Sequence, residues 1–207
     1  MTNTKINRKD VITKTEFQAT MDKATKIKNE YYKLRLRCML AILKKIGKRR
    51  GELASLEMED VKVQGENLSL TFTVLKKRRK TAETVTLRRE KQIPLTDPLT
   101  TPIIEYLTYM KTNHPNCKYL FPSTTNVFGT TIHFNTEKHL SGRQILRLIQ
   151  SVNPKAWVHL FRETVGAEIV RADPSLLSIY KVMMRLDLES EQTAWRYIRR
   201  YHIDLIK

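Results

Sequence analysis

The residues with the clearest chemical potential are a histidine and an arginine in HLFR, His159 and Arg162. In a helix, positions three apart lie on one side, so both side chains could face the same ligand. A guanidinium is always charged and offers paired donors for two phosphate oxygens, while an imidazole exchanges protons near neutral pH. The motif would equally fit an ordinary amphipathic helix that buries Leu160 and Phe161. HLFR alone therefore leaves both interpretations open.

Lysine and arginine dominate the charge of the chain and gather in two short runs, KKIGKRR and LKKRRKT. The 207 residues include 38 Lys and Arg against 21 Asp and Glu, which gives a formal net charge of +17 at pH 7. Such an excess indicates a polyanionic partner, with a generally basic surface as the alternative. Nucleic acid fits better than a membrane, because the sequence has no long apolar run, signal peptide or lipidation motif.

The two cysteines, Cys38 and Cys117, lie far apart and belong to no CxxC pair. This pattern is typical of reduced thiols in an intracellular protein, and it does not predict a zinc site. We expect a location in the cytoplasm or nucleoid, or in the host cell if a mobile element encodes the chain.

The elements that would position these residues are mostly helical. Thr13 and Glu16 form a capping box before a first helix, and a second helix is expected over 31–46, where Gly47 ends it. The remaining helical patterns lie at 51–61, 102–110, 141–150, 156–170, 174–184 and 193–201.

Two segments change to a period of two, LSLTFTV at 68–74 and TVTLRREKQIPL at 84–95. This alternation predicts strands of a small antiparallel sheet, with Gly65 and Asn67 at its first turn. The stretch from about 112 to 140 shows no sustained period and is expected to be irregular. The predicted fold class is therefore α+β, mainly α with a small antiparallel β-sheet.

One domain accounts for most of the chain. Residues 13–207 are expected to form it, because a hydrophobic content of 41% is enough for one buried core. Residues 1–12 are polar and basic without a sustained apolar period, so we expect a flexible arm or linker there.

Three segments, in the right order, resemble the tyrosine recombinase family, which includes the phage integrases. GKRRGELASLEMEDV is similar to the family pattern TGLRxxELxxLxxxDI and places Arg49 at the first catalytic arginine. HLFR is similar to the HxxR motif, with His159 and Arg162 at the matching positions. Tyr197 follows Arg162 by 35 residues, and Thr193 precedes it in the family's TxxxY spacing. Shorter agreements at KQIPL and YLFP extend the resemblance over nearly all of the expected domain.

The resemblance implies an enzyme that breaks and rejoins DNA through a covalent phosphotyrosine, without a metal or other cofactor. Tyr197 would attack the phosphorus as a phenolate and release the 5′-hydroxyl end of the strand. Arg49 and Arg162 would hold the nonbridging oxygens, where negative charge grows during the attack. His159 would exchange a proton with the tyrosine oxygen or donate to a nonbridging oxygen.

The family also uses a lysine on a β-hairpin as general acid toward the leaving oxygen. We assign this role to Lys80, because KT followed by a strand ending in KQIPL is similar to the family's order; Lys76 and Lys77 are the alternatives. The same run could instead contact phosphates at a hairpin tip. We expect DNA contacts from both basic runs, at Lys48, Arg50, Lys76, Lys77, Arg78 and Arg79.

One position departs from the family pattern. Nine residues before the tyrosine, where the family has His or Trp, this chain has Leu188. Because of this departure, Tyr201 of the same expected helix is an alternative nucleophile. Tyr180 is the third candidate. An aromatic stripe of this kind also fits simple packing.

The function implied by the resemblance is site-specific recombination of double-stranded DNA. A DNA-binding regulator without chemistry is the first alternative, which Leu188 would suit. A type IB topoisomerase, with similar chemistry but no specific site, is the second. Most family members carry an N-terminal core-binding domain, so we expect either a single-domain member or part of a longer protein.

Self-association on DNA, into a tetrameric synapse, is also implied. The apolar residues of the last segment would connect neighbouring protomers, or else fold back in cis: Ile198, Ile203, Leu205 and Ile206.

Overall fold

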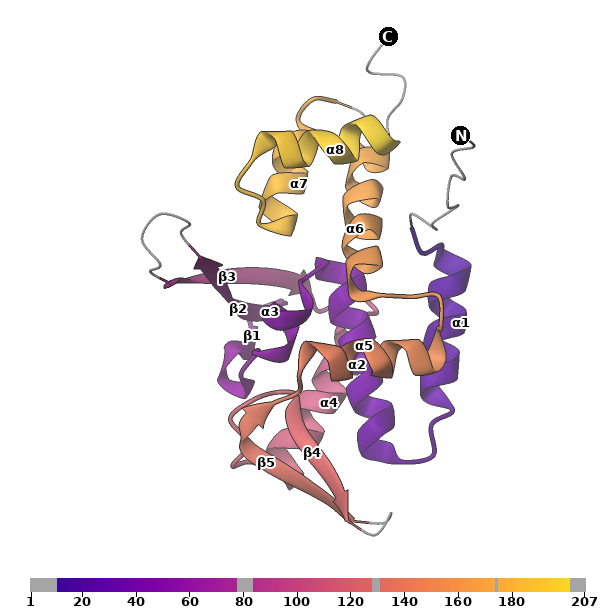
Figure 1. Cartoon of the computed structure of the whole chain (residues 1–207), viewed down its shortest axis with the longest axis vertical. Helices are drawn as coiled ribbons and strands as arrows, with labels where there is room; N and C mark the ends of the chain where they lie inside the picture. The colour runs from indigo at the N-terminus through magenta and orange to yellow at the C-terminus, as the bar shows by residue number, and fades with distance from the viewer. Residues whose placement is uncertain (1–10, 78–83, 128–130, 174, 202–207) are drawn as a thin grey trace, which may run out of the picture.

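A computed structural model of the chain describes residues 11–77, 84–127, 131–173 and 175–201. The described chain is mostly helical with two small antiparallel sheets, which confirms the predicted fold class. Figure 1 shows a β-hairpin projecting from one flank, with the C-terminal helices packed together at one end of the molecule. The helices are α1 (Lys14–Thr25), α2 (Glu30–Ile46), α3 (Arg50–Ala54), η1 (Met58–Asp60, a 3-10 turn), α4 (Thr100–Asn113), α5 (Gly142–Val152), α6 (Val158–Ala172), α7 (Ser178–Leu186) and α8 (Glu191–Tyr201).

Helix α2 is the centre of the main core. Asn29 caps its N-terminus by accepting a hydrogen bond from the Tyr32 amide at 3.1 Å. Gly47 ends it in the left-handed conformation, with a φ of 71°, as predicted. Eleven of its 17 residues are buried, because α1, α4, α5 and α6 all pack against it. The packing of α2 therefore fixes the position of Gly47, where the loop to α3 begins.

The first helix begins where the capping box predicted. The Thr13 side chain accepts from the Glu16 amide, and Glu16 accepts from the Thr13 amide at 3.0 Å. Ile12, the last residue of the expected arm, is buried, and its amide donates to Thr164 Oγ1 at 2.8 Å. The rest of that arm, up to residue 10, lies outside the described residues.

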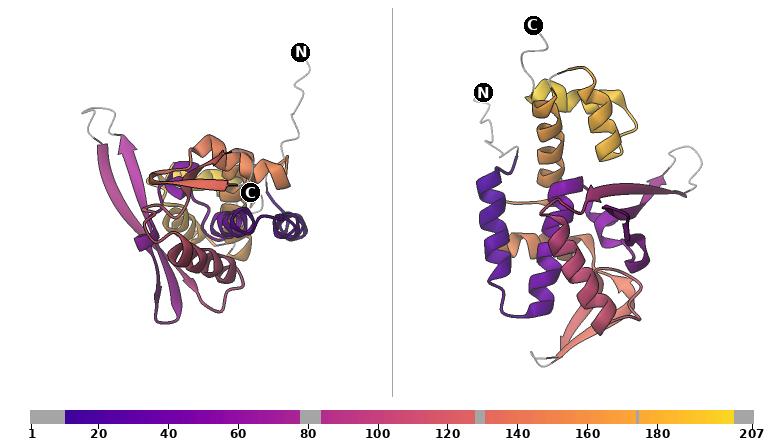
Figure 2. Two further views of the ribbon diagram at one scale, coloured as in Figure 1. Left: turned by 90° about the horizontal axis from the view of Figure 1, so that it is seen from below. Right: turned by 180° about the vertical axis from the view of Figure 1, so that it is seen from behind.

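The larger sheet contains β1 (Val61–Gln64), β2 (Asn67–Lys77) and β3 (Thr84–Pro94), antiparallel and in that order. Strands β2 and β3 pair continuously from Asn67 opposite Pro94 to Lys77 opposite Thr84. This is the sheet that the alternation predicted. Figures 1 and 2 show the far end of the β2–β3 hairpin pointing away from the helices.

The expectation of an irregular stretch at 112–140 is wrong over most of its second half. Strands β4 (Pro122–Val127) and β5 (Thr131–His139) form a separate two-stranded antiparallel sheet. From residue 132 onward β5 has only Ile132 and Phe134 half-buried, and its other side chains are exposed. A strand so largely exposed carries little hydrophobic alternation, so its sequence gave no strand signal.

Two predicted helices differ in extent. The helix expected at 51–61 divides into α3 and the turn η1, and the helix expected at 174–184 begins only at Ser178. The helices predicted at 102–110, 141–150, 156–170 and 193–201 are present as α4, α5, α6 and α8. Within the described residues, none of the helices combines the length and apolar character needed to span a membrane.

The buried residues form two clusters rather than one. The larger surrounds α2, while the smaller lies between the second half of α6 and helices α7 and α8. The smaller cluster includes Val165, Val170, Ile179, Val182, Leu186, Ala194 and Tyr197. Helices α7 and α8 thus form a small unit that packs on α6, at the upper end of the molecule in Figure 1.

Candidate functional site

Arg49 is placed by the short connection between α2 and α3. Its amide donates to Glu52 Oε2 at 3.1 Å, and its Nη1 donates to Glu52 Oε1 at 2.8 Å. The Glu52 carboxylate is buried, whereas half of the Arg49 side chain is exposed. Glu52 therefore orients the guanidinium while leaving part of it free to meet a ligand.

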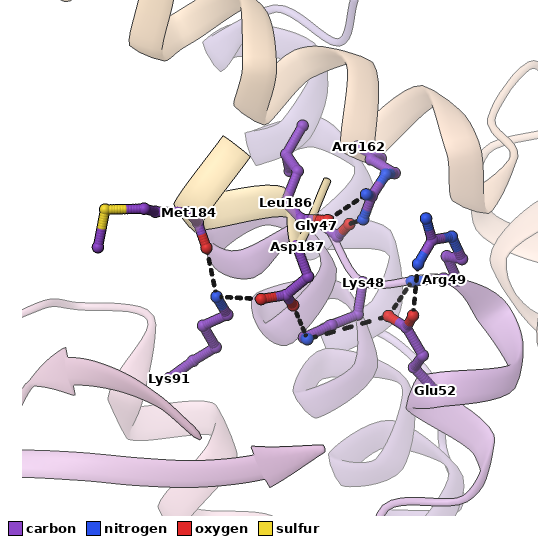
Figure 3. A network of polar contacts seen from close by, with 9 residues as sticks. All are labelled: Gly47, Lys48, Arg49, Glu52, Lys91, Arg162, Met184, Leu186 and Asp187. Atoms are coloured by element: carbon purple, nitrogen blue, oxygen red, sulfur yellow. Dashed lines mark hydrogen bonds and ion pairs between the residues drawn. The ribbon is translucent and has the colours of Figure 1, made fainter. Parts of the chain in front are cut away.

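Arg162 lies on α6 and is almost fully buried, at 2% exposure. It donates to the carbonyl oxygens of Gly47, at 2.9 Å, and of Leu186 (Figure 3). Burial, followed by the nearby charge of Arg49, lowers its pKa, but a guanidinium stays charged at physiological pH. Two carbonyl bonds leave other donors of the fork available for an anion.

Gly47 allows these elements to approach closely. Its φ is positive, and a Cβ at this position would lie 2.9 Å from Leu186 Cδ2 and 3.3 Å from Arg162 Cα. A side chain here would therefore be strained and would push α6 and α7 away from the end of α2.

The structure brings three of the predicted catalytic residues together around one cavity. Arg49, His159 and Arg162 all line a hollow of about 300 Å³, together with Arg50 and others. His159 is 62% exposed, and its Nε2 lies 3.0 Å from Glu163 Oε1, one turn further along α6. The interpretation of HLFR as an amphipathic helix is also partly right, because Leu160 and Phe161 are buried. One helix thus serves both the core and the cavity.

Tyr197 lies on α8, beside Arg162 but not among the residues that line this cavity. Only 5% of it is exposed. Burial, then the charge of Glu163, raises the pKa of its phenol, while Arg162 opposes the rise by its charge and a hydrogen bond. The phenol is therefore neutral at physiological pH and must lose its proton to become a nucleophile.

The Tyr197 ring rests directly against the backbone of α6 at Gly166. A Cβ at Gly166 would lie 2.3 Å from Tyr197 Cδ1 and 2.4 Å from Cε1, closer than two carbon atoms can approach. The absence of a side chain at Gly166 therefore allows α8 to bring the ring up to α6.

Replacing Gly166 by Ala should lower the stability of the fold, because the ring would have to leave this position. Overpacking costs about 1–3 kcal/mol, against roughly 1 kcal/mol gained from the higher helix propensity of Ala. Thermal unfolding measures the difference. Gly51→Ala is the matched control, since nothing lies within 4 Å of that position. Unfolding of Gly166→Ala at the wild-type temperature would contradict this packing.

Lys48, which we expected to contact DNA, is buried beside the same cavity. Its side chain is 1% exposed, its Nζ lies 2.5 Å from Asp187 Oδ2, and it also lies over the Phe72 ring. Its ammonium group is thus paired with a carboxylate inside the protein. The sequence did not indicate this burial, because Lys48 stands next to two exposed arginines in one basic run.

Lys91 completes this buried cluster. Its Nζ lies 2.7 Å from Asp187 Oδ1 and donates to the Met184 carbonyl at 2.5 Å. Figure 3 shows Lys48 and Lys91 reaching the same carboxylate from opposite sides.

The basic run of the hairpin is described only in part. Lys76 and Lys77 end β2, opposite Val85 and Thr84, at the projecting end of the hairpin. Arg78, Arg79 and Lys80 lie outside the described residues, and so do the tail residues Ile203, Leu205 and Ile206.

Leu188 lies close to the site without a polar group to contribute. It lines a larger hollow of about 800 Å³ that Arg49 and Arg50 also border, and it packs against the smaller core cluster. Tyr180 is 56% exposed on α7, while Tyr201 ends α8 with its side chain outside the described part.

Sequence reasoning missed four residues that shape the site: Glu163, Gly166, Lys91 and Asp187. Two of them left a signal, since Glu163 is four positions after His159 and Gly166 is a small residue inside a helix. Lys91 begins the KQIPL segment that resembles the family, but nothing in the sequence indicates that Asp187 joins it.

Comparison with known proteins identifies the family of the chain. The sequence model described as the phage integrase family matches residues 10–202, and the chain belongs to that family, the tyrosine recombinases. Among curated proteins, no individual sequence matches the chain significantly.

Solved structures share the fold. One is the XerH site-specific recombinase bound to difH substrate in a pre-cleavage complex, with a TM-score of 0.62 and 15% identity over 99% of this chain and 54% of that chain. Another is XerA recombinase, with a TM-score of 0.66 and 17% identity over 97% of this chain and 65% of that chain. The chain thus spans about half to two thirds of the length of these recombinases.

Proposed function

We propose that this chain is the catalytic domain of a site-specific DNA recombinase that cleaves and rejoins strands through a 3′-phosphotyrosyl intermediate. One observation carries the proposal. Arg49, His159 and Arg162 line a single cavity, and Tyr197 lies beside Arg162, which lowers the pKa of its phenol. Residues 13–207 would form this domain, and no metal or cofactor would take part.

The geometry suits stabilisation of a phosphorane-like transition state. The attack of Tyr197 Oη on phosphorus forms one P–O bond and breaks the bond to the 5′-oxygen, which leaves with a proton. Charge grows on the two nonbridging oxygens during this step, and the forks of Arg49 and Arg162 would receive it. Rejoining reverses the exchange, because the phosphotyrosine retains the energy of the broken phosphodiester.

Two proton transfers must accompany these steps. The buried phenol has a raised pKa, so a base has to take its proton, and His159 is the residue that we assign to this role. Glu163, bonded to His159 Nε2, would hold the imidazole in place. Lys80 of the hairpin would protonate the leaving oxygen, with Lys76 and Lys77 as the alternatives.

A nicked suicide substrate tests the proposal. DNA with attachment-like repeats, sought beside the gene, would be nicked near the cleavage position, so that a short fragment diffuses away and traps the covalent adduct. A protein–DNA adduct that survives denaturing electrophoresis is the expected result. Specific binding without an adduct would instead identify a regulator. Relaxation of plasmids that lack any recognition site would identify a topoisomerase.

Binding to DNA should depend steeply on salt, because phosphate contacts dominate it. The log–log slope of affinity against salt should be several units negative, and neutralising Lys76, Lys77, Arg78 and Arg79 together should flatten it by up to about 3–4 units. Fluorescence anisotropy between about 50 and 200 mM salt would measure both slopes.

A matched control separates local contacts from total charge. Four exposed lysines outside the basic runs, neutralised together, should leave the slope nearly unchanged: Lys14, Lys23, Lys111 and Lys155. An affinity that does not respond to salt would count against DNA as the partner.

Synapsis would complete the reaction. We propose that protomers assemble on paired sites as a tetramer, with the apolar C-terminal segment as their connector. The XerH structure described above holds a recombinase on its difH substrate, which supports DNA as the common partner of this fold.

A further inference from the structure

Asp187 has an unusual backbone conformation. Among the described residues, it is the one non-glycine position with a positive φ, 49°, and it follows the last residue of α7. Helices often end on a left-handed residue, and glycine is preferred there because it has no Cβ. An aspartate accepts the conformation less easily, so its side chain has to supply a compensating interaction.

The carboxylate of Asp187 does so by binding two lysines at once. One oxygen lies 2.5 Å from Lys48 Nζ and the other 2.7 Å from Lys91 Nζ. All three side chains are largely buried, at 12%, 1% and 11% exposure for Asp187, Lys48 and Lys91. Charge-assisted bonds shielded from water in this way are among the stronger polar contacts in a protein.

The two lysines come from parts of the chain that serve different purposes. Lys48 immediately precedes Arg49 at the cavity, while Lys91 belongs to β3, a strand of the hairpin that bears the basic run. Removing the carboxylate would leave both ammonium groups facing one another. Glu52 Oε2, at 3.9 Å from Lys48, would then be the nearest remaining acid to that lysine.

The same short segment carries two further polar attachments of the unit formed by α7 and α8. Lys91 donates to the Met184 carbonyl, and Arg162 donates to the Leu186 carbonyl (Figure 3). Tyr197 lies ten positions beyond Asp187 in the next helix, and its ring rests on Gly166. Residues 184–187 therefore join the helices that carry Tyr197 to Arg162 of α6 and to Lys48 and Lys91 by polar contacts.

We propose that Asp187 is a positioning residue, an electrostatic latch that holds the α7–α8 unit, and with it Tyr197, against Arg49 and the hairpin. The inference rests on the proposed function for its consequence in cleavage, but the latch itself is a property of the free protein. Its loss leaves the clamp residues in place and lets the tyrosine unit move.

A simple helix cap is the competing explanation, and two substitutions separate it from the latch. Asp187→Asn keeps the shape and the tolerance for a left-handed backbone but removes the charge. Asp187→Gly removes the side chain and relaxes the backbone. A cap role predicts that Gly performs as well as Asp, whereas the latch predicts that both variants fail.

Hydrogen exchange read by mass spectrometry tests this without any DNA. In both variants, the amides of α7 and α8 should exchange about tenfold faster or more, while those of α2 and α4 keep the wild-type rate. Asp173→Asn is the matched control, because Asp173 binds Lys181 of the same unit in a more exposed pair. That variant should leave α8 unchanged.

Wild-type protection of α7 and α8 in either Asp187 variant overturns the latch. If Asp187→Asn does not fold, Lys91→Met is the alternative variant, because it keeps the ion pair between Asp187 and Lys48. The amides of α7 and α8 should then still exchange faster than in the wild type, while those of α2 and α4 do not. Wild-type exchange of α7 and α8 in Lys91→Met would also overturn the proposal. Single-turnover cleavage at saturating DNA supplies the second readout, expected to fall while affinity stays constant. A protein that never forms an adduct contradicts the proposed function alone, since exchange measures the latch separately.

Discussion

Replacing Tyr197 by Phe should abolish covalent attachment to DNA while leaving affinity and folding nearly intact. The variant removes only the nucleophilic oxygen. The ring can still pack against Gly166 within the smaller core cluster. The polar interaction between the phenol oxygen and Arg162 is lost. Denaturing electrophoresis with the nicked substrate, beside a binding isotherm, measures both properties.

Tyr180→Phe is the matched control for this loss. Tyr180 is 56% exposed on α7, away from the cavity, so its variant should form the adduct at the wild-type rate. If Phe at position 197 still yields an adduct, the nucleophile is another tyrosine. Tyr201→Phe is then the variant to test.

Substituting Arg49 or Arg162 by Lys should slow cleavage by roughly a hundred- to a thousandfold, or about 2.7–4 kcal/mol of transition-state stabilisation. A lysine places one point charge where the guanidinium offers two parallel donors to the phosphate oxygens. Single-turnover cleavage at saturating DNA isolates this effect from binding.

The two arginine variants should differ in stability. Arg162 donates hydrogen bonds to the carbonyls of Gly47 and Leu186, so Arg162→Lys should lower the melting temperature. Arg49→Lys should lower it less, because half of the Arg49 side chain is exposed. Arg171→Lys, at an exposed position in the last turn of α6, is the matched control. Cleavage near the wild-type rate by either variant would remove that arginine from the clamp.

Local signals account for what the sequence could predict. The capping box at Thr13, the terminal Gly47 and the alternation in β2 and β3 each act within a few residues, and the structure confirms all three. The helical spacing of His159 and Arg162 is also a local signal, because it depends only on the geometry of one helix.

The parts that could not be predicted depend on distant partners. Lys48 and Arg49 are neighbours in one basic run, yet Lys48 is buried because Asp187, 139 positions away, neutralises it. Strand β5 is defined by pairing with β4 rather than by its own apolar pattern. Tertiary contacts of this kind decide a residue's surroundings, and propensity along the chain does not report them.

The hydrogen bond from the Ile12 amide to Thr164 joins residues 152 positions apart. Asn153 likewise reaches Thr20, across 133 positions. During synthesis, α1, α2 and α4 therefore leave the ribosome long before α5 and α6, which pack on α1 and α2. Until α6 has been made, part of the apolar surface of α2 stays exposed, and such non-local closure is slow and open to aggregation. We expect this domain to fold only when nearly all of it has been made.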